Sequence, residues 1–248
     1  MHSGSDEGRA SPIDSGAGHD CGATDRREFL GRLGVGAAVF AAASVGAAVP
    51  LATAGAESVG RRGTGAMRAP WSDAWLQKLT GKHKQFFDAT TTNESFALAF
   101  AANFLNLNHE AYGLEDKDLT AVVGLRHFAM PMALPDELWA KYKIGAAFQI
   151  KDPVSSAPAT RNPFIHADGV LLPGSDIPTL QKRGVLFTVC NVALTILSGN
   201  LSKNAGVTKE AAKAEWTEKL LPGTTLVPVG VMAVNLAQEH GCTYCYGG

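Results

Sequence analysis

The sequence predicts an α/β protein with a largely parallel sheet. Two short apolar runs, residues 119–125 (LTAVVGL) and 185–190 (VLFTVC), have the composition of strands that are buried on both faces. A third run, residues 226–229 (LVPV), has the same character, and stretches with helical spacing of apolar residues separate the three. Because parallel neighbours need a crossover that is usually helical, this alternation favours a mostly parallel sheet covered by helices.

The overall composition limits the classes of partner. Of the 248 residues, 46% are apolar and 18% are charged, with 22 basic against 23 acidic side chains. This length and apolar fraction permit a sizeable core. Proteins that bind polyanions normally carry a basic excess, so the near-zero net charge argues against nucleic acid as a partner.

The N-terminal segment has the features of an export signal. Arg26 and Arg27 directly precede an aromatic residue and a leucine, residues 33–56 contain no charge, and the run ends in Ala-Gly-Ala. These features in this order resemble a bacterial twin-arginine signal with a signal-peptidase site. We therefore predict that residues 1–56 are a polar leader and signal peptide, and that the protein is exported to the periplasm. Since the run is rich in Ala and Gly, no stable membrane span is expected after cleavage, although an uncleaved anchor is the alternative.

The remainder of the chain divides into a short lead-in and one domain. Residues 57–68 are rich in Gly and Arg, which is typical of a flexible segment, and residues 71–79 have the pattern of a short helix with two tryptophans. We predict a flexible lead-in with a short helix over residues 57–80 and an α/β domain over residues 81–248.

The first half of this domain is predicted to contain two strands and two helices. Its elements, in chain order, are a strand at 84–88, a helix from 96 to 107, a strand at 119–125, a loop that holds His127, a helix at 136–142 and a Pro/Ser/Ala-rich surface loop at 151–164. The helix from residue 96 carries phenylalanines at helical spacing, which indicates a face directed at the core.

The second half is predicted to contain three more strands. Its elements are a helix at 177–183, a strand at 185–190, helices at 192–197 and 208–220, a strand at 226–229, a helix at 231–240 and a short final strand at 242–246. Asn191 is expected to cap the helix that follows the strand at 185–190. Pro228 places its strand at an edge or a strand end, because proline cannot donate to the sheet.

Cys190 is the candidate reactive residue of the domain. It stands where a buried strand passes into a helix, and the carboxyl ends of parallel strands face the ligand crevice of an open sheet. The N-terminus of the following helix offers unpaired N–H groups and partial positive charge, which favour a thiolate over a thiol. The alternative is a buried and inert core cysteine.

The motif from Cys242 to Cys245 (C-x-x-C) is the second cysteine feature. In an extended strand its Cα atoms would lie ~10 Å apart, beyond the ~7 Å limit for a disulfide. An oxidising envelope favours a turn with a disulfide, which would make the motif a candidate redox pair. The alternative is a zinc site with His240 and Cys190 as further ligands.

Two histidines are candidate proton carriers beside Cys190. His127 follows the strand at 119–125, and His166 follows the long loop. A structural role is the alternative for each. No glycine-rich phosphate loop and no clustered metal-carboxylate motif occurs in the sequence, so we predict neither a cofactor nor a metal site.

Two segments of the C-terminal third resemble the DsrE/DsrF-like sulfur-relay family. They are residues 180–191 (LQKRGVLFTVCN) and residues 220–231 (LLPGTTLVPVGV); residues 86–125 match the family more loosely. The resemblance implies a flavodoxin-like, DsrE-like three-layer sandwich and assembly into homo-oligomers, either trimers or hexamers. It also implies a cysteine that carries persulfide sulfur between proteins, a position that Cys190 matches.

Together these features predict an exported DsrE-like protein that acts through Cys190 as a sulfur (persulfide) carrier or a thiol-redox protein. Its expected partner is a sulfur donor or acceptor protein, or a small sulfur compound. Two other functions are open: a non-catalytic oligomeric envelope module that binds a ligand or partner, and a Cys/His metal-binding protein.

Overall fold

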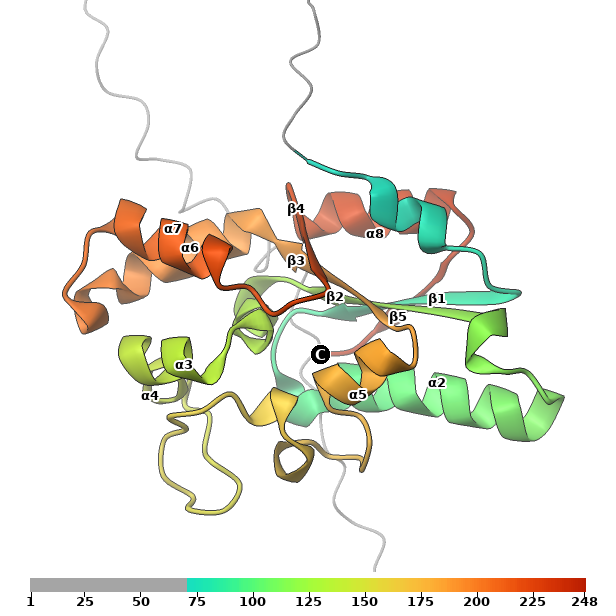
Figure 1. Cartoon of the computed structure of the whole chain (residues 1–248), viewed down its shortest axis with the longest axis horizontal. Helices are drawn as coiled ribbons and strands as arrows, with labels where there is room; N and C mark the ends of the chain where they lie inside the picture. The colour runs from blue at the N-terminus through green and yellow to red at the C-terminus, as the bar shows by residue number, and fades with distance from the viewer. Residues whose placement is uncertain (1–70) are drawn as a thin grey trace, which may run out of the picture. The chain divides into compact units, whose positions relative to one another are not determined.

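Five parallel strands form one sheet at the centre of the protein, in the order β4-β3-β2-β1-β5 (Figure 1). The computed structural model describes residues 71–248; the predicted signal at 1–56 and the lead-in at 57–70 lie outside these residues. The strands are β1 (His83–Ala89), β2 (Leu119–Leu125), β3 (Leu186–Cys190), β4 (Thr224–Val227) and β5 (Thr243–Tyr246). Within the described residues all pairings between these strands are parallel, so the predicted sheet is confirmed.

Alternating side chains of the strands supply the two faces of the sheet. All seven residues of β2 are buried, as its nearly continuous apolar sequence predicts. Phe86 and Val122 pack on one face, and their neighbours Phe87 and Val123 pack on the other. The period-two geometry of a strand explains this division.

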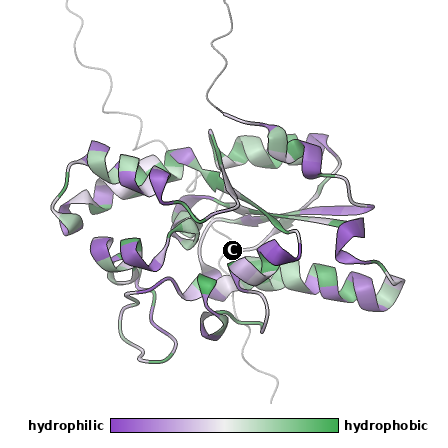
Figure 2. Ribbon diagram, in the orientation of Figure 1, coloured by the Kyte–Doolittle hydropathy of each residue, from purple (hydrophilic) through white to green (hydrophobic). Residues whose placement is uncertain are grey.

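Helices cover both faces and complete a three-layer α/β/α arrangement. One face packs against α8 (Gly230–Glu239) and the 3-10 helix Ala74–Lys78, and the other against α2 (Phe96–Tyr112). The remaining α-helices of the described residues are α3 (Asp136–Tyr142), α4 (Ile144–Phe148), α5 (Ile177–Lys182), α6 (Asn191–Leu201) and α7 (Lys209–Glu218). Hydrophobic and hydrophilic residues alternate along the outer helices, as expected for elements with one buried face (Figure 2). The architecture is that of a flavodoxin-like three-layer sandwich.

The order of the strands explains why α8 lies on the face opposite α2. From β1 to β4 each new strand is added on the same side of its predecessor, whereas β5 returns to the far side of β1. Because such crossovers are right-handed, a step in the opposite direction must pass over the opposite face. The C-terminal segment therefore lies beside β1, and β4 is an edge strand, as Pro228 predicts.

Trp75 and Leu76 of the 3-10 helix Ala74–Lys78, and Leu79 directly after it, are buried in the domain core beside α8. The short helix predicted in this segment is therefore present and contributes to the core. No helix of residues 71–248 has the length and apolar character needed to cross a bilayer.

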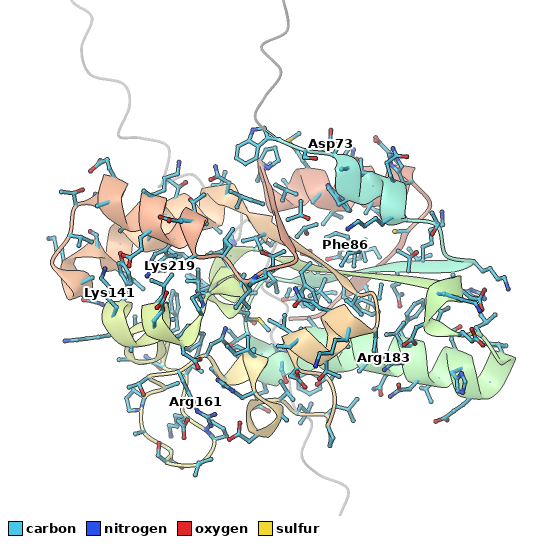
Figure 3. All side chains as sticks on the ribbon, viewed as in Figure 1. Asp73, Phe86, Lys141, Arg161, Arg183 and Lys219 are labelled. Carbon is cyan, nitrogen blue, oxygen red and sulfur yellow. The ribbon has the colours of Figure 1, made fainter. Side chains whose placement is uncertain are left out.

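The long loop at 151–164 is exposed only in its first part. Residues 153–158 are exposed, but Asn162 is fully buried and donates to the carbonyls of Met132 and Leu134 at 2.8 and 2.7 Å. Arg161 bridges Asp152 and Asp168 at 3.0 and 2.7 Å (Figure 3). These contacts hold the end of the loop against the core, so the surface-loop prediction is wrong for that end. Buried asparagine and proline cannot be told from exposed ones by composition.

Candidate functional site

Cys190 ends β3 and is itself the N-cap of α6. Its Sγ accepts a hydrogen bond from the backbone N–H of Ala193 at 3.4 Å. The prediction that Asn191 caps this helix is wrong, because the helix begins one residue earlier than its apolar pattern suggests. The sulfur of Cys190 thus lies among the unpaired N–H groups of a helix N-terminus, where a negative charge is stabilised.

A cavity of about 270 Å³ opens beside this sulfur, and we call it the Cys190 cavity. It is formed by the segment that follows β2, the first turns of α6 and the start of α8 (Figure 1). Its polar lining comes from Cys190, Arg126 and His127. Its apolar lining includes Phe128, Val192, Ile196 and Val231, each about half exposed. Cys190 itself is 5% exposed, so the thiol lies at the base of a mainly apolar pocket.

Arg126 brings a fixed positive charge to the Cys190 cavity. Its Nε and Nη2 donate to the two carboxylate oxygens of Asp88, each at 2.7 Å. Asp88 lies on β1 and is 1% exposed, and its Oδ2 also accepts a hydrogen bond from the Tyr244 hydroxyl at 2.9 Å. The carboxyl edge of the sheet therefore carries Asp88 on β1, Arg126 after β2 and Cys190 at the end of β3.

The protonation states in this network follow from its geometry. Mainly through the hydrogen bond to Asp88, the pKa of Arg126 is raised above its usual value, so the guanidinium stays charged. Burial, followed by the hydrogen bond to Asp88, raises the pKa of Tyr244. The Tyr244 hydroxyl thus keeps its proton and donates it to the carboxylate.

Gly230 leaves the space that Arg126 occupies. A Cβ at this first residue of α8 would lie 2.7 Å from the Cβ and 2.8 Å from the Cδ of Arg126. Sequence reasoning singled out neither residue. Arg126 directly follows a buried strand, and Cys190 was chosen as a candidate because it ends one. The same criterion would have identified Arg126.

Of the two candidate histidines, only His127 lies with Cys190. His127 lines the Cys190 cavity and has a left-handed backbone (φ 50°), a conformation in which histidine is more common than most residues. His166 lies on the far part of the loop region, where its Nε2 is 2.9 Å from Asp136 Oδ2. It does not line the cavity, and its contacts fit a structural role.

The two C-terminal cysteines are separate from each other and from Cys190. Cys242 packs with Trp75 and α8 on one face, whereas Cys245, on β5, packs against the core on the other. The short final strand predicted at 242–246 is confirmed as β5, and all three described cysteines are free, so the alternative of a turn with a disulfide is wrong. The reason is that Thr243–Tyr246 pairs with β1 and is held extended. Burial raises the pKa of both C-terminal thiols.

The position of β5 also separates these cysteines from Cys190. Strands β1 and β2 lie between β5 and β3, which places Cys245 about 14 Å or more from Cys190 at ordinary strand spacing. The C-terminus does not fold back over Cys190. The suggested redox pair is therefore not arranged to resolve a disulfide or persulfide on Cys190.

The zinc alternative has no ligand group in the described structure. Among residues 71–248, no three His, Cys, Asp or Glu side chains are grouped so that they could hold a metal ion. His240, the suggested extra ligand, has its Nδ1 2.8 Å from the Leu236 carbonyl of its own helix.

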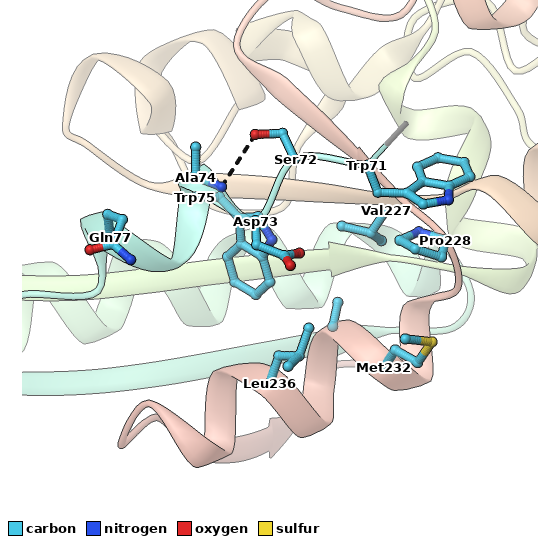
Figure 4. A pocket seen from close by; sticks show the side chains of 11 residues that line it. Trp71, Ser72, Asp73, Ala74, Trp75, Gln77, Val227, Pro228, Met232 and Leu236 are labelled. Atoms are coloured by element: carbon cyan, nitrogen blue, oxygen red, sulfur yellow. Dashed lines mark hydrogen bonds between the residues drawn. The ribbon is translucent and has the colours of Figure 1, made fainter. Parts of the chain in front are cut away.

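A larger groove of about 910 Å³ lies between residues 71–77, the end of β4 and α8 (Figure 4). Trp71, Pro228, Met232 and Leu236 give it a largely apolar surface, and Asp73 is its charged residue. No cysteine or histidine lines it. Reactive chemistry is therefore better supported at the smaller Cys190 cavity, where a nucleophile and a cation meet.

No family model, no curated protein and no solved structure matches this chain. Fold and site together define a parallel α/β protein with a cysteine thiol at a helix N-terminus.

Proposed function

We propose that the protein is a sulfur carrier in which the Cys190 thiolate accepts a sulfane sulfur and passes it on. The observation that carries this proposal is the position of Cys190 as the N-cap of α6, in a cavity that also contains Arg126. Helix N-termini and neighbouring cations stabilise thiolates, which are the nucleophilic form of cysteine. The sequence resemblance to sulfur-relay proteins at residues 180–191 supports the same role.

The transfer step is a nucleophilic displacement at sulfur. With thiosulfate as the donor, the Cys190 thiolate attacks the sulfane sulfur, a new S–S bond forms on Cys190, and the S–S bond to the sulfonate breaks. Sulfite leaves with the electron pair, and Cys190 holds a persulfide anion. With a hydropersulfide donor the leaving thiolate takes up a proton, and in this proposal His127, which lines the same cavity, supplies it.

The walls of the cavity suit such an intermediate. Phe128, Val192, Ile196 and Val231 surround the thiol with apolar side chains, and these limit the access of water and oxidants to a persulfide. Because the same side chains are about half exposed, they also offer a surface for a donor or acceptor protein or for a second copy of the chain. Homo-oligomers and export through the signal at residues 1–56 are part of this proposal.

Intact-mass and peptide-mass measurements test the carrier role. After incubation with thiosulfate or polysulfide, we expect the native chain to gain the mass of sulfur at Cys190, and the Cys190→Ser variant to lose that gain. Cys245→Ser is the matched control and should keep it, because Cys245 lies on another strand. If Cys190→Ser gains as much sulfur as the native chain, the carrier role is rejected.

A non-catalytic binding module is the second candidate. The low exposure of Cys190, 5%, is the observation in its favour. It predicts that Cys190 resists iodoacetamide in the native state and reacts only after unfolding. Rapid labelling of native Cys190 would instead support the carrier role.

A further inference from the structure

We infer that the Cys190 cavity selects anionic ligands, that Arg126 recognises their negative charge, and that Tyr244 acts through Asp88 to position Arg126. This inference rests on the proposed role of Cys190 as a reactive thiol. It narrows the ligand class to small sulfur compounds with a sulfonate or carboxylate group.

The lining of the Cys190 cavity carries a positive charge. Arg126 is its one permanently charged side chain, and no acidic residue of the described chain lines it. Asp88, which balances Arg126, is 1% exposed and is not part of the lining. A ligand in the cavity therefore meets the cation and not its counter-ion.

Arg126 has an N–H group that its bonds to Asp88 leave free. A guanidinium has five N–H donors in a planar fork. Nε and Nη2 are engaged by Asp88, and Nη1 has no hydrogen-bond partner among residues 71–248. This group can donate to an oxygen of a sulfonate or carboxylate, the acceptors that guanidinium groups bind best.

The position of Arg126 is fixed before a ligand arrives. Two bonds to a buried carboxylate define the plane of the guanidinium. Tyr244 holds that carboxylate from β5, at 2.9 Å, and Gly230 leaves room for the arginine side chain. A donor fixed in this way loses little conformational freedom on binding. Tyr244 is thus a positioning residue that connects the C-terminal strand to the cavity.

Charge repulsion between an anionic donor and the Cys190 thiolate explains why a cation beside the thiol favours the reaction. An anionic donor that approaches a thiolate brings like charges together, which is unfavourable at short distance. The guanidinium and the N–H groups of α6 offset this repulsion at the point of attack. A neutral reagent experiences no such repulsion. Comparing the reaction rates of an anionic and a neutral reagent therefore separates the effect of charge from the effect of access to the thiol.

The test compares iodoacetate with iodoacetamide on the full chain. Both transfer a carbon to sulfur: an S–C bond forms on Cys190, the C–I bond breaks, and iodide leaves with the electron pair. The two reagents differ chiefly in charge. Peptide mapping gives the two rates at Cys190, and their ratio measures the preference for an anion.

We expect Arg126→Gln to lower the iodoacetate-to-iodoacetamide ratio by about tenfold, which corresponds to ~1.4 kcal/mol. Arg126→Lys keeps the charge and should retain most of the ratio. Tyr244→Phe should lower the ratio by about threefold without removing any charge from the lining. Tyr246→Phe is the matched control, because its hydroxyl lies near Thr90 Oγ1 at 3.3 Å and not at Asp88. It should leave the ratio unchanged.

Two results would overturn the inference. One is an unchanged ratio in both Tyr244→Phe and Arg126→Gln; if Arg126→Gln does not fold, an unchanged ratio in Tyr244→Phe decides alone. The other is failure of native Cys190 to react with either reagent, since the cavity would then be closed to small anions. The carrier role is judged separately: a cavity that prefers anions but gains no sulfur from thiosulfate or polysulfide rejects that role and keeps this inference.

Discussion

Cys190 and Cys245 are the same residue type on two strands of one sheet, and they differ in the helix, the charge and the packing beside the sulfur. Cys190 ends its strand, caps a helix and shares a cavity with Arg126. Cys245 lies within its strand, packs against apolar residues, and has a pKa raised by burial. In this comparison the thiol at the end of a strand lies beside a helix N-terminus and a cavity, whereas the thiol within a strand is part of the packing.

The same contrast applies to the charged pairs of the protein. Arg126–Asp88 and Arg183–Asp116 are both bidentate, with distances of 2.7 to 2.9 Å. The side chain of Asp88 is 2% exposed, whereas that of Asp116 is 36% exposed. The first pair lies at the candidate site and the second on the surface, so they form a matched pair for experiment.

The largest effect is expected when Arg126 is removed. Arg126→Leu leaves the buried Asp88 carboxylate without its cation, which should lower the free energy of unfolding by about 3 kcal/mol. Arg183→Leu, the control, should cost ~1 kcal/mol or less, because Asp116 can be hydrated. Urea unfolding of both variants measures the difference, and equal losses would show that burial of the carboxylate is unimportant.

The second largest effect is expected in the labelling rates of Cys190 and Cys245. Burial removes the water that stabilises a thiolate, so the pKa of Cys245 moves up from its ordinary value of 9.0 and its thiolate fraction near neutral pH falls. Its labelling rate should therefore still be rising above pH 9. At pH 8 we expect iodoacetamide to label Cys190 at least ~10-fold faster than Cys245, as measured by peptide mapping. The reverse order would remove the contrast between the two strands.

A smaller effect is expected at Gly230. Gly230→Ala places a methyl group against the Arg126 side chain, and we expect a loss of about 1–2 kcal/mol in the free energy of unfolding. Gly199→Ala, also in a helix, is the control, because its Cβ would lie 3.6 Å from Lys209, an ordinary contact. That variant should gain about 0.5–1 kcal/mol from helix propensity. Thermal or urea unfolding gives both values, and a loss in the control would contradict the steric argument.

The smallest effect is expected from Cys245→Ser on the chemistry of Cys190. Since the two residues are on strands separated by β1 and β2, sulfur uptake at Cys190 should change by less than about twofold. Mass measurement of sulfur uptake provides the check. A Cys190–Cys245 disulfide after mild oxidation would show that the C-terminal strand leaves the sheet.

Much of the fold could be predicted because local pattern and tertiary environment agree. The run at 119–125 is nearly all apolar because β2 is buried on both faces, and its predicted bounds match the strand. Helix α3 (Asp136–Tyr142) likewise has the predicted bounds. Predictions failed where a choice depended on contacts distant in sequence. The segment from Cys242 to Cys245 is extended because β1 is available to pair with it, which spacing alone does not reveal.

The sequence by itself determined the layered α/β architecture and the placement of Cys190 at the junction of a strand and a helix, because both follow from periodicities within a few residues. Only the tertiary structure decided what surrounds that thiol. Asp88 near the end of β1 and Arg126 after β2 meet because parallel strands place their carboxyl ends at one edge, and the Tyr244 hydroxyl reaches Asp88 from β5. The same pairing held Cys242 and Cys245 on opposite faces and left Cys190 with a cation as its neighbour.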